Sequence, residues 1–209
     1  FETKNSAPLS KILLPGIVLM PKTKFKAAFI SGEKFIDIDV NGKSLFIGGF
    51  EMKNIVFQAG KKNGTELLNA KFDAAKIYIS DSSYIENVKL NTNLLPDSIL
   101  INLKWNNLST DINKANFEGY ISTKNPELIK FKITESRIHI HDSLWQIEPD
   151  NLLTFDSLGF SFKKFKAFHK NEFIEFVSMF DERENAYQHE MTLYEFNVGW
   201  LNPILKSSG

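Results

Sequence analysis

The chain has 209 residues, 43% hydrophobic and 24% charged, a balance that excludes intrinsic disorder. Lys and Arg together number 25, as do Asp and Glu, so no basic surplus attracts nucleic acid or an anionic membrane over long range. The absence of cysteine excludes disulfides, thiol catalysis and cysteine-ligated metals. The 19 phenylalanines, which lack a polar tip, favour buried or at least apolar surroundings.

The first predicted element is a short helix over residues 6–16. Ser6 is a suitable cap, Pro8 suits an early helical position, and Pro15-Gly16 is a stop signal. The apolar run 12–20 is shorter than the ~20 residues of a membrane span and is broken by the same Pro-Gly pair. We therefore expect any membrane anchor to lie outside this chain.

From residue 35 onward the apolar residues alternate with period two, which predicts half-buried β-strands. Asn41-Gly42 is a strong hairpin signal and predicts a turn after the first strand. Turn residues separate the later segments at intervals of roughly ten residues. The predicted strands of the first half are 35–40, 44–50, 52–59, 67–72, 74–80, 84–91 and 98–105.

The second half continues in the same way. Its predicted strands are 116–123, 128–134, 137–141, 144–148, 153–157, 159–165, 172–180, 189–196 and 196–200. Residues 200–209 end the chain with a second short helix signal, and 201–205 align with 9–13. We interpret residues 1–209 as a single segment excised from a longer repetitive β protein.

Two pairs of identical adjacent residues predict bends in the sheet. They are Gly48-Gly49 and Lys163-Lys164, and the second shifts the apolar register between Phe162 and Phe165. A meander of about fourteen to seventeen strands could form a sandwich or a closed barrel, but such bends favour an elongated, curled, antiparallel all-β sheet with short terminal helices. An open sheet of this kind leaves an apolar groove along its concave face.

Strand faces of this type form either an ordinary core or a ligand groove. The candidate lining residues are those that alternate with polar residues along the predicted strands. They are Ile36, Ile38, Val40, Ile77, Ile79, Ile99, Ile101, Leu103, Ile138, Ile140, Phe160 and Phe162.

The segment RIHIHDSLWQI contains two histidines at a spacing of two. His139 and His141 share a strand face opposite Ile138 and Ile140, and the sequence implies no third ligand. We therefore interpret them as outer-face residues and expect no metal or other cofactor.

The acid-rich segment 181–190, which includes His189, is interpreted as a polar loop. No sequence motif indicates catalysis, and we expect no enzymatic activity.

Four stretches resemble the TamB family, the translocation and assembly module subunit, within the AsmA-like bridge lipid-transfer proteins, and the resemblance is to Bacteroidota members. The stretches span most of the chain in order, and one of them carries an IxIxDSLWxIxPDN hairpin. They are Leu9–Phe29, Ser98–Ile121, Ile133–Asn151 and Phe196–Leu205.

This resemblance implies a β-taco groove that passes phospholipid between the inner and outer membranes and supports outer-membrane biogenesis. It also implies a periplasmic location, an inner-membrane anchor outside this chain, and an outer-membrane partner of the Omp85 barrel type. Two alternatives remain: a chaperone or assembly scaffold that pairs its edge strands with outer-membrane protein clients, and an extracellular β-sandwich binding module.

Overall fold

The computed structural model describes residues 17–19, 22–30, 35–47, 49–61, 67–79, 84–107, 113–125, 127–140 and 143–197. Both predicted terminal helices and the aligned segments 9–13 and 201–205 lie outside these residues. The described strands are β1 (Ile17–Leu19), β2 (Lys24–Ile30), β3 (Phe35–Ile47), β4 (Phe50–Lys61), β5 (Leu68–Tyr78), β6 (Tyr84–Leu95), β7 (Ser98–Asn106), β8 (Asn113–Ser122), β9 (Ile129–Ile140), β10 (Ser143–Ile147), β11 (Leu152–Asp156), β12 (Gly159–Lys163), β13 (Phe165–His169), β14 (Glu172–Asp181) and β15 (Ala186–Tyr194).

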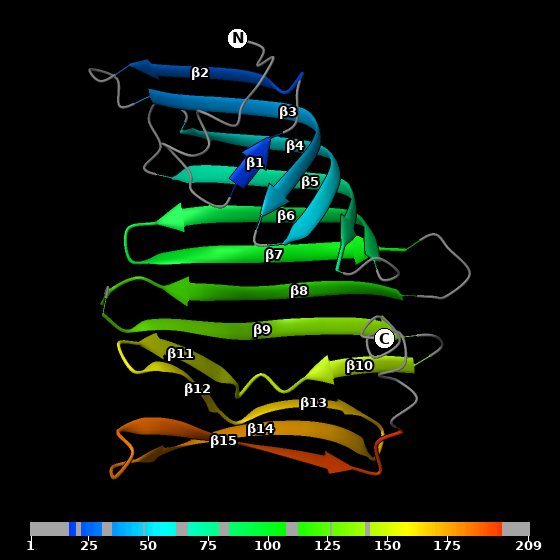
Figure 1. The fold of residues 1–209 in the computed structure, drawn as a ribbon, viewed down its shortest axis with the longest axis vertical. Coiled ribbons are helices and arrows are strands. Elements are labelled where there is room, and N and C mark those ends of the chain that lie inside the picture. The colour runs from blue at the N-terminus through cyan, green and yellow to red at the C-terminus, as the bar shows by residue number, and fades with distance from the viewer. Residues whose placement is uncertain are drawn as a thin grey trace.

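These strands form one antiparallel sheet in which most chain neighbours pair with each other, whereas β10 pairs with β13 and β11 and β12 form a hairpin beside β9 (Figure 1). At one end, β1 and β2 both pair with β3; at the other, β15 pairs with β14. No described strand joins the two ends, so the sheet is open. The predicted open, curled, antiparallel meander is thereby confirmed, and within the described residues a two-sheet sandwich or closed barrel is not formed.

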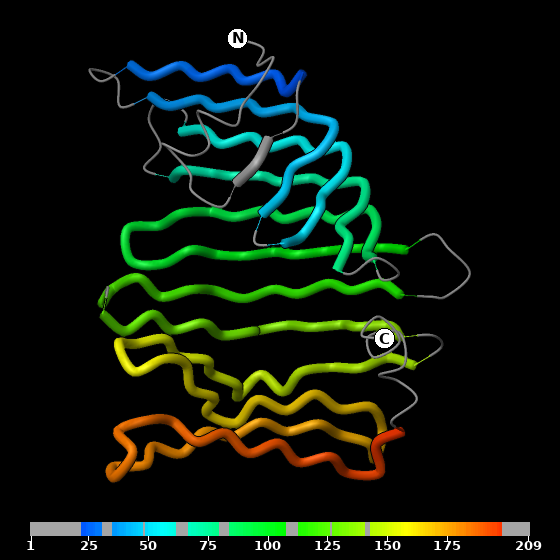
Figure 2. Tube along the Cα trace, viewed as in Figure 1, coloured from blue at the N-terminus to red at the C-terminus, as the bar shows by residue number. Residues whose placement is uncertain are grey.

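A sharp corner crosses four neighbouring strands, β3 to β6, and is visible where their traces turn (Figure 2). At this line the pairing skips Lys43, Asn54, Ala75 and Asn87. Asn54 and Asn87 have φ values of 48° and 51°, the left-handed conformation that asparagine tolerates better than most residues. The corner divides each of these strands into a long arm and a short arm.

The corner changes which residues face inward. On β3 the inward residues are Val40 before the corner and Leu45 after it, an odd spacing that a straight strand would not give. The residues packed inside the corner form the main core cluster of the described chain: Leu45, Ile55, Ala74 and Val88. Since this cluster joins both arms, it fixes the angle between them.

The sequence-based hairpin at Asn41-Gly42 is wrong. Both residues lie inside β3, where they pair with Val56 and Ile55. The glycine serves packing instead, because a Cβ at Gly42 would lie 3.0 Å from Oγ1 of the fully buried Thr23. The shift in apolar register at the corner made one bent strand resemble two strands with a turn between them.

The two pairs of identical adjacent residues that predicted bends in the sheet differ in what they form. Gly49, with φ of 89°, lies in the tight turn between β3 and β4, so this pair corresponds to a hairpin rather than a bend; Gly48 lies outside the described residues. Lys164 adopts φ of 55° between β12 and β13, and Phe162 and Phe165 come together with ring centroids 5.8 Å apart. The second pair therefore shifts the register as predicted.

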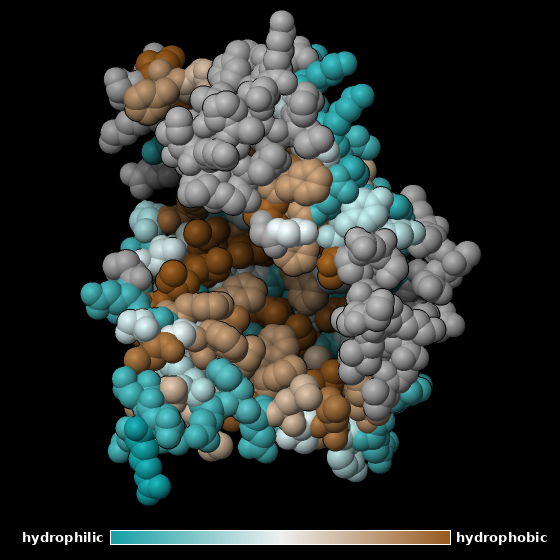
Figure 3. All heavy atoms as spheres, in the orientation of Figure 1, coloured by the Kyte–Doolittle hydropathy of each residue, from teal (hydrophilic) through white to brown (hydrophobic). Residues whose placement is uncertain are grey.

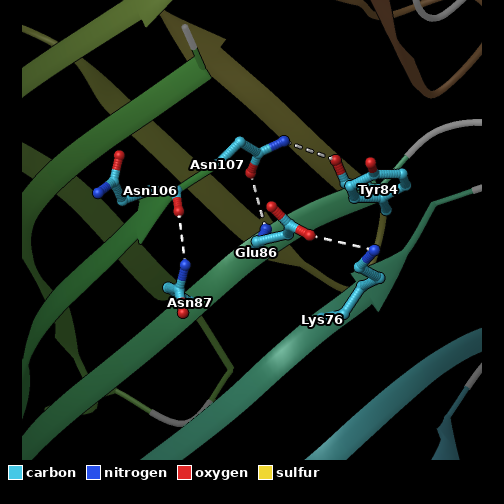
Figure 4. A network of polar contacts seen from close by, with 6 residues as sticks. All are labelled: Lys76, Tyr84, Glu86, Asn87, Asn106 and Asn107. Atoms are coloured by element: carbon cyan, nitrogen blue, oxygen red, sulfur yellow. Dashed lines mark hydrogen bonds and ion pairs between the residues drawn. The ribbon is translucent and has the colours of Figure 1, made fainter. Parts of the chain in front are cut away.

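A polar network holds the corner of β6 in place (Figure 4). The side chain of Asn107 accepts a hydrogen bond from the backbone N–H of Glu86 at 2.7 Å and donates one to the carbonyl of Tyr84 at 3.1 Å. Asn87 donates to the carbonyl of Asn106 at 2.8 Å. These side chains replace ladder bonds that β6 loses where it turns away from β7, because buried backbone groups need partners.

β9 is paired on one edge by two different strands. Residues 129–131 pair with β11 and residues 138–140 pair with β10, which leaves a gap between them. The 3% exposed Asn151 fills this gap: its Oδ1 accepts from the N–H of Ile133 at 2.9 Å, and its Nδ2 donates to the Ile133 carbonyl at 2.7 Å. The asparagine side chain thus acts as a one-residue substitute for a strand.

A bulge in β9 preserves the apolar face across the sheet. The register with β8 shifts between Glu118 and Gly119, so Thr134 is an extra residue on β9. A Cβ at Gly119 would collide with the carbonyl oxygen of Lys132. Glycine is therefore required where the two backbones approach most closely.

Candidate functional site: the apolar face

The inner face of the sheet is built from side chains that oppose one another across consecutive strands, since paired residues in an antiparallel ladder point to the same side. One row runs from β2 to β12 and contains a single charged residue, Lys61. Its members are Phe29, Ile36, Lys61, Leu68, Leu94, Ile99, Ile121, Phe131, Leu153 and Phe162. A parallel row contains Phe25, Val40, Phe57, Phe72, Leu90, Leu103 and Phe117.

Ten of the twelve candidate lining residues lie on this face within the rows just described or directly beside them. These are Ile36, Ile38, Val40, Ile99, Ile101, Leu103, Ile138, Ile140, Phe160 and Phe162. Ile77 lies beyond the corner, on the short arm of β5, where it packs against the core cluster. Ile79 follows the end of β5 and is 50% exposed. Contact between these residues and acyl chains stays a prediction.

Sequence reasoning missed several residues of the same face. Phe57, Phe72, Leu90 and Phe117 are paired directly with candidate residues or with one another. The signal was present for Phe72, Leu90 and Phe117, which have polar neighbours on both sides in their strands, whereas Phe57 follows the apolar Val56. Phe165 and Phe176 were harder to find, since the bulge at Lys164 reverses the alternation between β12 and β13.

The face is hollowed and apolar, as Figure 3 shows for the side viewed in Figure 1. Within the described residues, four large side chains of this face are between 39% and 72% exposed: Phe29, Ile129, Phe155 and Phe160. Side chains of this kind are usually buried in a closed core. The apolar face is therefore only partly covered by the described residues.

An aromatic cluster lies at the β12–β15 end of this face, formed by Phe160, Phe162, Phe165, Phe176 and His189. The ring centroids of Phe162 lie 5.5 Å from those of Phe160 and Phe176. His189 stacks on Phe160 at 4.6 Å with an interplanar angle of 6°. Phe160 is nevertheless 43% exposed, so this end offers aromatic surface as well as packing.

The acid-rich segment 181–190 is not a single loop. β14 reaches Asp181 and β15 begins at Ala186, so only 182–185 form the turn. The Asp181 carboxylate accepts hydrogen bonds from the backbone of Arg183 at 2.8 Å and from the side chain of Gln188 at 2.6 Å. His189 lies on the apolar face, 2.8 Å from the Ser178 hydroxyl, rather than among the acids. The segment is therefore a β-hairpin whose turn is capped by the Asp181 carboxylate.

The outer face is polar. His139 lies on it, opposite Lys114 and Leu144, while Ile138 and Ile140 face inward; His141 and Asp142 lie outside the described residues. In the part of the chain that the structure describes, no three His, Asp or Glu side chains group as metal ligands would. This arrangement agrees with the outer-face interpretation of His139.

Among the described residues, two ionisable groups have perturbed pKa values, and both belong to contacts between strands. A hydrogen bond to Glu86, with Nζ 3.1 Å from the carboxylate, raises the pKa of Lys76; this ammonium also lies 3.7 Å from the Tyr84 ring centroid. A hydrogen bond to Asp156 at 2.8 Å raises the pKa of Tyr187. In each case the partner that raises the pKa is a carboxylate from another strand.

Within the described residues, no helix has the length and apolarity that crossing a membrane requires. Comparisons with protein-family models, with curated proteins and with solved structures found no match to this chain.

Proposed function

We propose that this chain is a segment of a periplasmic bridge whose apolar face carries phospholipid acyl chains between the inner and outer membranes and supports outer-membrane protein assembly. The supporting observation is a partly uncovered apolar face that continues from strand to strand across an open sheet. In the full-length protein, the proposal includes an inner-membrane anchor and an Omp85-type barrel as the outer-membrane partner.

The dimensions and energetics suit this role. Twelve strands follow one another along the sheet, and at ~4.8 Å each they extend over about 50 Å. An acyl chain that fills half a bilayer core of ~30 Å would cross about three strands. Each methylene removed from water contributes about 0.8 kcal/mol, so burying a dozen is worth roughly 10 kcal/mol. No catalytic residue is needed for such transfer.

The test is to extract the purified protein with organic solvent and measure phospholipid by mass spectrometry. Ile101→Asp places a carboxylate on the inner face, where burial of an unpaired charge costs several kcal/mol. Asn93→Asp adds the same charge on the exposed outer face. We expect a reproducible lipid ratio in the wild type and in Asn93→Asp, and loss of lipid in Ile101→Asp. Lipid-free wild-type protein would refute the proposal, and circular dichroism checks folding.

A second candidate is the assembly scaffold, and the observation in its favour is the exposed edge of β15. Among the described strands, this nine-residue strand pairs with β14 only, and Met191 is 56% exposed. Thr192→Lys puts a charge on this edge, on the side away from the apolar face. If the scaffold is the main role, this variant lowers capture of an outer-membrane strand peptide while lipid content stays unchanged. Ile101→Asp would give the opposite result.

A further inference from the structure

The outer face of β6 to β9 carries a concentration of positive charge that the neutral composition conceals. Two neighbouring rows cross these four strands. One contains Lys89, Lys104, Asn116 and Arg137; the other contains Asn87, Asn106, Lys114 and His139. Together they line a shallow cleft of about 580 Å³. These eight positions include four cations and three amides but no carboxylate.

Two lysines face each other directly in this cleft. Lys89 is paired with Lys104 across β6 and β7, and the neighbouring Lys114 is paired with His139 across β8 and β9. Like-charged residues placed directly opposite in a sheet destabilise it. Within the described part of the chain, neither Lys89, Lys104 nor Lys114 forms an ion pair with a carboxylate.

Among the described acids on strands beside the cleft, none forms an ion pair with Lys89, Lys104 or Lys114. Glu135 is engaged with Arg137 at 3.0 Å, and Glu118 accepts a hydrogen bond from Asn102 at 3.0 Å. Asp73 faces Lys89 from β5, at the rim of the cleft. Within the described residues, Lys104 and Lys114 at the centre of the cleft therefore have no carboxylate partner.

We propose that this cleft binds a phosphate-type oxyanion, either a free phosphate ester or the phosphate of a lipid headgroup. Lysine ammonium groups and asparagine amides supply charged and neutral donors, and an anion held between Lys104 and Lys114 would relieve the repulsion within the rows. The cleft opens on the face opposite the apolar one, so the inference does not depend on lipid passage along the groove.

The experiment measures binding in two arms. Isothermal titration with glycerol-3-phosphate, with glycerol as the neutral comparison, tests a soluble ester. Flotation with phosphatidylcholine vesicles, with and without phosphatidic acid, tests a headgroup at a bilayer surface. The variant is Lys104→Gln/Lys114→Gln, and the matched control is Lys71→Gln/Lys130→Gln, two exposed outer-face lysines elsewhere on the sheet.

We expect saturable binding in at least one arm, weakened about tenfold or more by Lys104→Gln/Lys114→Gln, because two charge-assisted contacts are lost. The control variant should stay within about twofold, and rising ionic strength should weaken the binding. Which arm responds identifies the source of the phosphate. Absence of saturable binding in both arms, or equal losses in variant and control, would overturn the proposal. The variant removes repulsion, so its thermal unfolding temperature should not fall, and this checks that it folds.

Discussion

The side chain of Asn151 should determine whether β9 can be paired by two strands on one edge. We consider its replacement by alanine. Asn151 is 3% exposed, and its amide satisfies both backbone groups of Ile133 and also donates to the carbonyl of Glu148. Alanine supplies none of these contacts, and the neighbouring β10 and β11 are held apart by the turn between them.

The expected loss of folding stability follows from the backbone groups that lose their hydrogen-bond partners. Leaving a buried donor or acceptor without a partner costs about 1–3 kcal/mol. The N–H and carbonyl of Ile133 both lose their partner, and water entering the gap would offset part of this loss. We therefore expect Asn151→Ala to lower the free energy of unfolding by about 2–5 kcal/mol. Asn151→Asp keeps only the acceptor and should be comparably destabilising, because its carboxylate would face two carbonyls.

Urea unfolding monitored by circular dichroism measures this change, and amide hydrogen exchange at Ile133 locates it. Asn91→Ala is the matched control, an asparagine on the exposed outer face of β6, and it should alter stability by no more than about 0.5 kcal/mol. If Asn151→Ala were equally neutral and the Ile133 amide kept its protection, the strand-substitute role of this side chain would be wrong.

Further predictions concern the bulge, the two faces and the corner. Gly119→Ala should destabilise the sheet by about 1–3 kcal/mol in thermal or urea unfolding, because the added methyl group meets a backbone carbonyl; an unchanged midpoint would contradict this. Ile140→Asp should reduce co-purified phospholipid whereas His139→Ala should not, since the two residues face opposite sides; a loss with the histidine variant would refute this assignment. The raised pKa of Lys76 contributes stability that is fully present below the unfolded-state value of about 10.4 and is lost as pH rises through the folded-state value. Stability measured from roughly pH 10 upward should therefore fall less steeply in Glu86→Gln than in the wild type, and identical slopes would exclude this contribution.

The corner explains most of the errors in predicting individual strands. A straight strand keeps its apolar residues at even spacing, whereas β3 and β5 change register where they bend. In the sequence this change resembles the end of one strand and the start of another, and so 35–40 and 44–50 were separated although 35–47 form one strand. The same reasoning misplaced a hairpin at Asn41-Gly42, where the small residue accommodates Thr23 instead.

The basic cleft illustrates a different limit of sequence reasoning. Lys89, Lys104, Lys114 and Arg137 come from four strands and are separated in the sequence by residues of both charges. The total of 25 cations and 25 anions indicated no electrostatic site. Only the register of β6 to β9 brings the lysines to one place, because register decides which residues become neighbours across strands.

The sequence by itself determined the all-β class, the antiparallel meander and the inward direction of most apolar residues, because alternation with period two is a local property of each strand. It also located the bulge at Lys164, where two adjacent lysines interrupt that alternation. The tertiary structure alone decided that the strands bend together at the corner, that Asn151 substitutes for a strand, and that the outer lysines converge. These features depend on contacts between residues distant in the chain, and such contacts leave no periodic signal in the sequence.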